Sequence, residues 1–98
     1  MKPRIKIAVK PVGKPVRVEE ICNRLDSLQG IVDGYIEVFR ITEDLAIVCN
    51  EEGRVNGMEF NCRAFGQDFY GDIFVVGIDG EDFTDVSDVK IIKLLLEG

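Results

Sequence analysis

Apolar and polar residues alternate near the start of the chain, in the stretch RIKIAVK at residues 4–10. Ile5, Ile7 and Val9 share one face, the basic residues share the other, and Ala8 is small enough for either. Because successive side chains of a strand point to opposite sides, this pattern predicts a half-buried strand. The prolines and glycine of the following KPVGKPVR predict a loop or an irregular edge.

The next segment, residues 18–30, has the residue spacing of an amphipathic helix. Acidic residues near its start favour the helix dipole, and Gly30 or Gly34 can end it. Because residues on one helical face recur every three or four positions, the pattern predicts a helix with Leu25 in the core. The apolar positions with this spacing are Val18, Ile21, Leu25, Leu28 and Val32.

Three further stretches have the composition of strands. Residues 35–41 and 45–50 are rich in β-branched and other apolar residues and are separated by a short polar turn, so they predict a hairpin. Residues 72–78 are apolar on both faces, which indicates a central strand that is covered on both sides. The dipeptide Asp79-Gly80 is typical of a two-residue hairpin turn.

The end of the chain predicts a second helix, over residues 87–97. Thr84 or Ser87 can cap its start, and we expect it to bury the apolar residues Val89, Ile91, Ile92, Leu95 and Leu96. Strands grouped with a helix near each end predict an α+β fold. We expect a single domain over residues 1–98, with four to six mainly antiparallel strands packed by the two helices.

Charge is distributed unevenly along the chain. Residues 1–17 carry six bases and no acid, whereas residues 18–98 carry six bases and eighteen acids, a net charge of −12. An acidic body disfavours a nucleic-acid partner, because phosphate contacts need positive surface. The basic segment is either a nucleic-acid-binding arm or an edge strand whose outward charges block sheet-to-sheet pairing. We favour the edge strand, because no aromatic residue accompanies Arg4, Lys6 and Lys10 to stack on bases.

Composition and cysteine usage indicate a globular cytoplasmic protein. The 98 residues are 46% hydrophobic and 31% charged, and no apolar run approaches the ~20 residues of a membrane span. The first residues lack the uninterrupted apolar stretch of a signal peptide. Three cysteines without C-x-x-C spacing do not make a disulfide framework. We therefore expect reduced thiols and no membrane association.

Most catalytic and metal-binding patterns do not occur in this sequence. The chain has no histidine, which removes the commonest general base and zinc ligand. It contains no phosphate-binding glycine motif and no serine-nucleophile motif, and its acidic segment at residues 79–88 does not fit a calcium-binding loop. The acids Glu37, Glu51, Glu52 and Asp72 could pair for acid–base chemistry, but nothing in their spacing requires it. We expect no catalytic residues, no metal site and no cofactor.

The stretch NEEGRVNGMEFNCRA at residues 50–64 is dense in turn-forming residues. We expect Gly53 to adopt a positive φ that closes a first turn, and Asn56-Gly57 to form a second turn of the primed type. This reading explains the glycines. It does not explain the polar residues Asn50, Asn61 and Arg63 equally well.

These unexplained residues predict a binding site at one end of the sheet. Alternate strand residues point the same way, and a hairpin returns the end of strand 45–50 beside the start of strand 35–41. Asp72 either completes the patch or pairs with an arginine. The predicted site residues are Tyr35, Glu37, Asn50, Glu51, Asn61, Arg63 and Asp72. The competing interpretation is that both asparagines only tie turn backbones together, as asparagine readily does.

Three stretches of the chain also resemble a known family: LQGIVDGYIEV at 28–38, VCNEEGRVNGMEFNCRA at 48–64 and GDIFVVG at 71–77. Their order and spacing are similar to the landmarks of an uncharacterised family, a domain of unknown function found in bacteria, phages and mobile elements. Asp33 and Cys62 depart from that pattern. The resemblance implies an intracellular setting in phage or mobile-element biology and implies no activity.

Taken together, these observations predict a non-catalytic protein-interaction module whose partner is a host or phage protein or a second copy of the chain. One alternative is a protein that binds or sequesters a small, nucleotide-like ligand through its asparagine, arginine and tyrosine groups. Another alternative is an acidic DNA mimic, which the charge of −12 over residues 18–98 favours. An enzyme with paired carboxylates is the remaining alternative.

Overall fold

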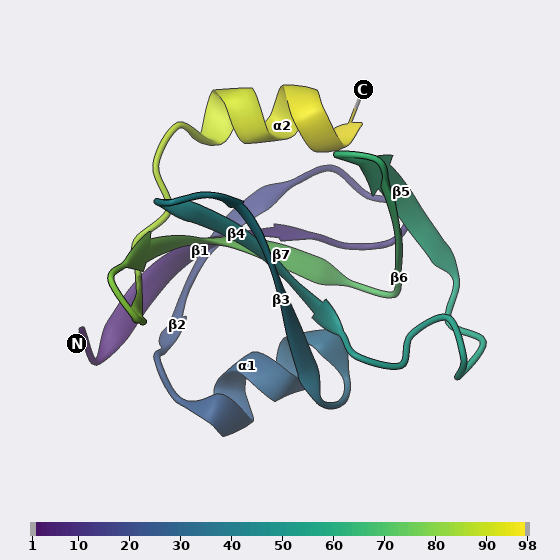
Figure 1. Ribbon diagram of the computed structural model, residues 1–98, viewed down its shortest axis with the longest axis horizontal. Helices are drawn as coiled ribbons and strands as arrows, with labels where there is room; N and C mark the ends of the chain where they lie inside the picture. The colour runs from purple at the N-terminus through teal and green to yellow at the C-terminus, as the bar shows by residue number, and fades with distance from the viewer. Residues whose placement is uncertain (1, 98) are drawn as a thin grey trace.

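The chain folds into a central antiparallel sheet with one helix on each face (Figure 1). The computed structural model describes residues 2–97. This arrangement confirms the predicted α+β class and its mainly antiparallel sheet. The elements are β1 (Arg4–Lys10), β2 (Arg17–Cys22), α1 (Leu25–Val32), β3 (Ile36–Thr42), β4 (Leu45–Asn50), β5 (Phe60–Ala64), β6 (Gln67–Tyr70), β7 (Ile73–Asp79), β8 (Asp82–Thr84) and α2 (Val89–Glu97).

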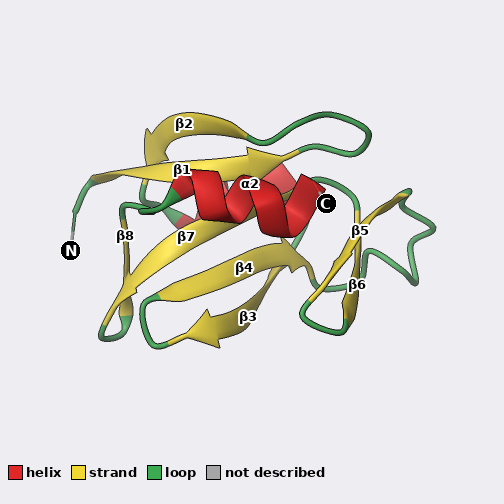
Figure 2. Cartoon of the chain, turned by 90° about the horizontal axis from the view of Figure 1, so that it is seen from above, coloured by secondary structure: helices red, strands yellow, loops and turns green. Residues whose placement is uncertain are grey.

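The main sheet has the strand order β2-β1-β7-β4-β3, and the short strand β8 pairs with β7 (Figure 2). Its central strand β7 is buried from Ile73 to Ile78, as the two-sided apolar pattern predicts, because a layer of side chains covers each face. A hairpin forms here, but its two-residue turn is one position later than predicted: Asp79 pairs with Asp82, so Gly80, at a φ of 65°, and Glu81 make the turn. On the same strand Gly77 is packed so closely that a Cβ there would lie 2.2 Å from the Asp85 carbonyl oxygen.

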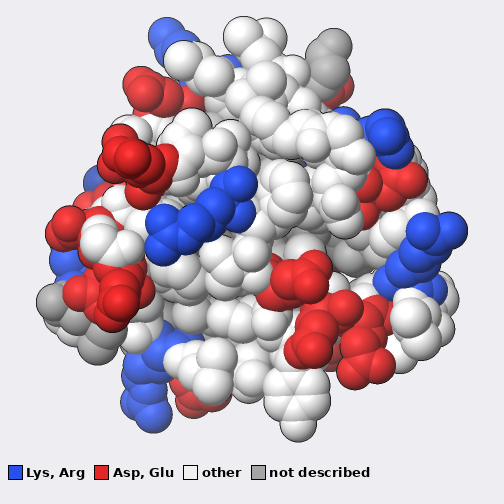
Figure 3. All heavy atoms as spheres, in the orientation of Figure 1, with Lys and Arg blue, Asp and Glu red and all other residues white. Residues whose placement is uncertain are grey.

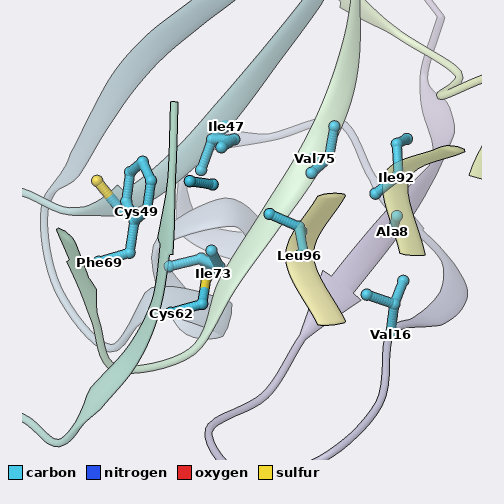
Figure 4. Packing of buried hydrophobic residues seen from close by; sticks show 11 residues of the cluster. Ala8, Val16, Ile47, Cys49, Cys62, Phe69, Ile73, Val75, Ile92 and Leu96 are labelled. Carbon is cyan, nitrogen blue, oxygen red and sulfur yellow. The ribbon is translucent and has the colours of Figure 1, made fainter. Parts of the chain in front are cut away.

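One face of the sheet is covered by α2 together with a separate hairpin, β5–β6. Ile92 and Leu96 of α2 and Phe69 of β6 pack over Ile47 and Val75 of the sheet (Figure 4). The opposite face packs against α1 through its buried residues Leu28 and Val32. The sheet therefore separates two apolar layers, which is why β7 has no polar face.

The predicted helix over residues 18–30 is wrong in its first half. Residues 17–22 instead form β2, which pairs with the full length of β1 from Arg4↔Cys22 to Val9↔Arg17. Leu25 opens α1 and is 58% exposed, so it is not a core residue. Residues 17–22 form a strand because a helix there would leave the backbone N–H and C=O groups on one side of β1 without hydrogen-bond partners.

Strand β1 is consequently an interior strand, and its interpretation as an edge strand is wrong. Lys10, expected on the outward face, is only 6% exposed. Its ammonium donates to the carbonyl of Pro11 at 2.9 Å and to Oδ1 of Asn61 at 3.2 Å. Arg4 remains outward and pairs with Glu20 of β2 at 2.9 Å, so that charge supports a strand pair and does not block one.

The C-terminal helix exists but is shorter and less buried than predicted. It begins at Val89, and Thr84, expected as a cap, belongs to β8. Ile91 and Leu95 are exposed, because a helix lying on one face of a sheet buries only one stripe of its surface. Residues 2–97 form eight strands where four to six were predicted, and the additional ones include β2 and the β5–β6 hairpin.

Candidate functional site

Asn50 is a buried structural residue at the end of β4. Its Nδ2 donates to the carbonyls of Val32 and Asp33, at 3.0 and 3.1 Å, where α1 ends. Its Oδ1 accepts from the backbone N–H of Glu52 at 2.8 Å. The side chain approaches Gly34 so closely that a Cβ there would lie 2.6 Å from Nδ2. Asn50 thus joins the end of α1 to the turn after β4.

Asn61 has a similar structural role in β5. Its Nδ2 donates to the carbonyls of Lys10 and Gly71, at 2.8 and 2.7 Å, while its Oδ1 accepts from the Lys10 ammonium. All of its hydrogen-bonding atoms are therefore used inside the protein. For both asparagines, the geometry agrees with the interpretation that they tie turn backbones together.

Arg63 and Asp72 do not pair with each other as one version of the predicted site required. Arg63 donates to Asp68 at 2.8 Å and to the carbonyl of Gly66 at 3.3 Å, both within the β5–β6 hairpin. Asp72 accepts from the backbone N–H of Val12 at 2.9 Å and so fastens the loop after β1. The two residues line different hollows of the surface.

A cleft of about 310 Å³ lies between the start of β3, the end of β4 and the β5–β6 hairpin. It brings together four of the predicted site residues, and Cys49 and Phe69 also line it. Asn61 and Asp72 lie outside it. The predicted residues that line the cleft are Glu37, Asn50, Glu51 and Arg63.

Tyr35 lies next to this cleft without lining it. Its carbonyl accepts from the backbone N–H of Glu51 at 2.8 Å, and Ile36 pairs with Asn50, so the hairpin places these segments side by side as predicted. The side chain of Tyr35 is 70% exposed. Sequence reasoning therefore placed the start of β3 correctly beside the end of β4.

The cleft also contains polar residues that sequence reasoning missed, namely Arg54, Gln67, Asp68 and Tyr70. Tyr70 stacks edge-on against Phe60, with ring centroids 5.8 Å apart. Because the β5–β6 hairpin was not predicted, the position of β6 over the sheet could not be anticipated. The alternation of apolar and polar residue types over residues 60–64 was the signal available in the sequence, and in the structure Cys62 and Ala64 are the buried residues of β5.

A family model described as "Domain of unknown function (DUF3846)" matches residues 5–97. The chain belongs to this family. No curated protein and no solved structure matches it. Among residues 2–97, no helix of this DUF3846 domain is long and apolar enough to cross a membrane.

The turn that follows β4 in the DUF3846 domain is built differently from the prediction. The backbone N–H of Met58 donates to Gly53 and that of Gly57 donates to Arg54, the hydrogen-bond pattern that ends a helical turn, with Gly57 at a φ of 74°. Gly53 has no positive φ, and neither has Asn56, so both turn predictions are wrong there. Gly53 is instead a point of close approach, since a Cβ would lie 3.1 Å from the Tyr70 carbonyl oxygen.

The cleft thiol has suppressed reactivity. Burial, and after it the nearby Glu37 carboxylate, raise the pKa of Cys49 to about 11. Burial also raises the pKa of Cys62, which Lys10 partly offsets. Because the thiolate is the nucleophile, neither buried cysteine is activated at neutral pH.

The charged groups of the cleft fall into two kinds. Arg63 and Asp68 neutralise one another on one wall. Glu37, Glu51 and Arg54 form no ion pair with residues 2–97. Within the same residues no group of three or more potential metal-ligating side chains occurs. The cleft therefore offers two carboxylates and one guanidinium that a partner or ligand could engage.

Proposed function

We propose that this protein is a non-catalytic interaction module that binds a basic surface of another protein. The observation that carries the proposal is that three large apolar side chains, within the turn at residues 51–57 or on the segments next to it, are exposed. Tyr35, Val55 and Phe60 are 70%, 84% and 53% exposed. Aromatic residues such as Tyr35 and Phe60 are enriched in protein–protein interfaces.

The charge of the molecule favours a basic partner. The whole chain has a net charge of −6, because the six bases of residues 1–17 offset part of the −12 carried by residues 18–98. Acidic side chains gather in the lower right part of the face shown in Figure 3. Opposite charge on a partner would speed encounter and favour correct docking. An acidic DNA mimic would also have a basic protein as its partner and is a special case of this proposal.

The setting we propose is cytoplasmic and belongs to phage or mobile-element biology, with a host or phage protein as the partner. This part rests on the resemblance of the three landmark stretches. The non-catalytic character rests on the chemistry of the cleft, where Cys49 stays protonated, and on a chain without histidine.

A photo-cross-linking experiment tests the proposal. A benzophenone amino acid replaces Tyr35 in cells that naturally make the protein, and a matched variant carries it at Phe65, an exposed aromatic residue at the tip of the β5–β6 hairpin. We expect the probe at position 35 to cross-link a specific basic protein and the probe at position 65 to give far less of that product. Equal products from both positions, or none from position 35, would contradict the proposal.

A small-ligand binder is the second candidate, because the cleft of about 310 Å³ lies at the lower end of the size range of small-molecule pockets. Native mass spectrometry of the gently purified protein tests it. A retained small molecule that is lost in a Glu37→Lys variant would favour this candidate over the protein partner.

A further inference from the structure

Strand β3 forms one border of the main sheet. It pairs with β4 on one side, and within residues 2–97 no strand pairs with its other side. Figure 2 shows β3 at the lower border with no element beyond it. The outer backbone N–H and C=O groups of such a strand can accept one further strand.

The opposite border of the sheet, β2, is less available to a partner. Both of its glutamates are held in ion pairs, Glu19 with Arg17 of the same strand and Glu20 with Arg4 of β1. On β3, by contrast, Glu37 forms no ion pair with residues 2–97. The carboxylate of β3 is therefore ready to receive a basic group, whereas those of β2 are already neutralised.

The two sides of β3 present different chemistry. Glu37 and Phe39 face the layer that contains α2, because they pair with Cys49 and Ile47. Val38, which is partly exposed, faces the layer that contains α1 and pairs with Val48. A register shift after Arg40 limits regular pairing to the first five residues of the strand.

We infer that β3 binds an extended segment of a basic partner protein, which adds to the sheet as a strand and places a lysine or arginine beside Glu37. This inference rests on the proposed function and names the binding mode. Directly opposed residues of paired strands point to the same face, so the residue opposite Glu37 enters the side of the sheet where the cleft opens.

The cleft supplies what a basic side chain would meet there. Glu37 and Glu51 provide two carboxylates, which outnumber the one guanidinium, that of Arg54, that is unpaired in the described part of the chain. Tyr70 provides an aromatic ring that attracts a cation. The next residue of the added strand points to the opposite face, beside Val38, and is apolar. The recognised segment therefore combines backbone pairing for affinity with alternating basic and apolar residues for specificity.

A library of random linear dodecapeptides displayed on phage, selected on the purified full chain, tests the inference. We expect enriched peptides to carry lysine or arginine next to a β-branched or aromatic residue. For a synthetic copy of such a peptide, Glu37→Lys weakens binding by about tenfold or more, because a favourable charge pair becomes a repulsive one. The matched variant Glu43→Lys, an exposed acid in the turn after β3, changes binding by less than about twofold.

Hydrogen exchange locates the peptide. Slower exchange of amides at residues 36–40 supports the inference, whereas protection only at β2 or only on α2 overturns it. The inference is also overturned if no peptide is enriched or if the enriched peptides lack a basic residue. A dimer in sedimentation, with a second copy of the chain paired to β3, overturns it as well. Glu37→Gln, with an unchanged thermal midpoint, serves as the second variant if charge reversal perturbs folding. If position 35 still cross-links a basic protein while these tests fail, the binding mode is wrong and the interaction module stands.

Discussion

At the scale of single residues, Asn50 and Asn61 show how one side-chain amide can join separate parts of the backbone. Each one bonds to two carbonyl oxygens, and its own oxygen accepts from a third group. The turn-forming and polar residues of the sequence indicated a specific role for residues 50–64. These residue types could not show whether a side chain is structural or exposed, because that depends on which distant backbone groups lie within hydrogen-bonding distance of it.

Replacing Asn61 by alanine should therefore destabilise the protein. The change leaves the carbonyls of Lys10 and Gly71 and the buried Lys10 ammonium without this partner, which costs about 1–3 kcal/mol. Urea unfolding measures the loss. The control Arg63→Ala removes an exposed pair with Asp68 and should cost about 0–1 kcal/mol. Equal stability of the two variants would show that the Asn61 bonds are not needed.

The three cysteines should differ in reactivity toward a disulfide reagent at pH 8. Burial raises the pKa of Cys49 to about 11 and also raises that of Cys62, while Cys22 is only partly buried. We expect one thiol to react quickly in the native protein and all three to react in denaturant. Fast reaction of a Cys22→Ser variant would contradict this assignment.

At the scale of elements, the hydrophobic patterns of the sequence predicted strands most accurately where a single interaction, the burial of apolar side chains, dominates. The alternation of apolar and polar residues predicted β1, and the run of residues that is apolar on both faces predicted β7. The β5–β6 hairpin escaped prediction because its turn places Phe65 and Gly66 both at positive φ, 54° and 73°. Asparagine or aspartate normally precedes glycine in such a turn, so a phenylalanine gives no signal.

The same limit applies to the candidate site. The sequence placed the start of β3 beside the end of β4, since a short turn joins them. It did not predict the cleft, because one wall of it is β6, a strand whose position depends on packing of Phe69 against the sheet. Phe39 contacts Phe69 with ring centroids 5.8 Å apart, a contact between residues that no local pattern links.

The observed bounds of α1 make Leu28, and not Leu25, the leucine of that helix that contributes to the core. Leu28→Ala should cost about 2–5 kcal/mol, because Leu28 is buried among the residues of the α1 layer. Leu25→Ala, at a position that the sequence pattern placed in the core, should have little effect because that side chain is largely exposed. Chemical denaturation of both variants measures the difference. A larger loss for Leu25→Ala would refute the observed start of the helix.

The connection between β8 and α2 should respond to acid. The Lys2 ammonium, and after it the backbone N–H of Lys6, hold the pKa of Asp85 below its usual value. A lowered carboxyl pKa contributes stability above the ordinary value of about 3.9, and that contribution is lost as the pH falls through the folded-state value.

We therefore expect Asp85→Asn to lower the thermal midpoint at pH 7 and to have a smaller effect at pH 3. Circular dichroism at the two pH values measures both midpoints. An effect of equal size at both would show that the charge of Asp85 does not contribute.

At the scale of the whole molecule, the two apolar layers share one sheet. Side chains of β7 supply both layers, with Val75 on the α2 side and Phe74 on the α1 side. We expect one cooperative unfolding transition, in which far-ultraviolet circular dichroism and tyrosine fluorescence change together. Two separate transitions would mean that the layers unfold independently.

The position of β7 in the strand order has a consequence for synthesis on the ribosome. This strand pairs with β1 and with β4, yet it is the seventh of the eight strands to be made. Until it leaves the exit tunnel, the nascent chain can form the hairpins β1–β2, β3–β4 and β5–β6, but no strand joins the first two into one sheet. Because synthesis adds about 5–20 residues per second, the edges of β1 and β4 that later pair with β7 stay unpaired for seconds. Molecular chaperones would bind the nascent chain at these edges.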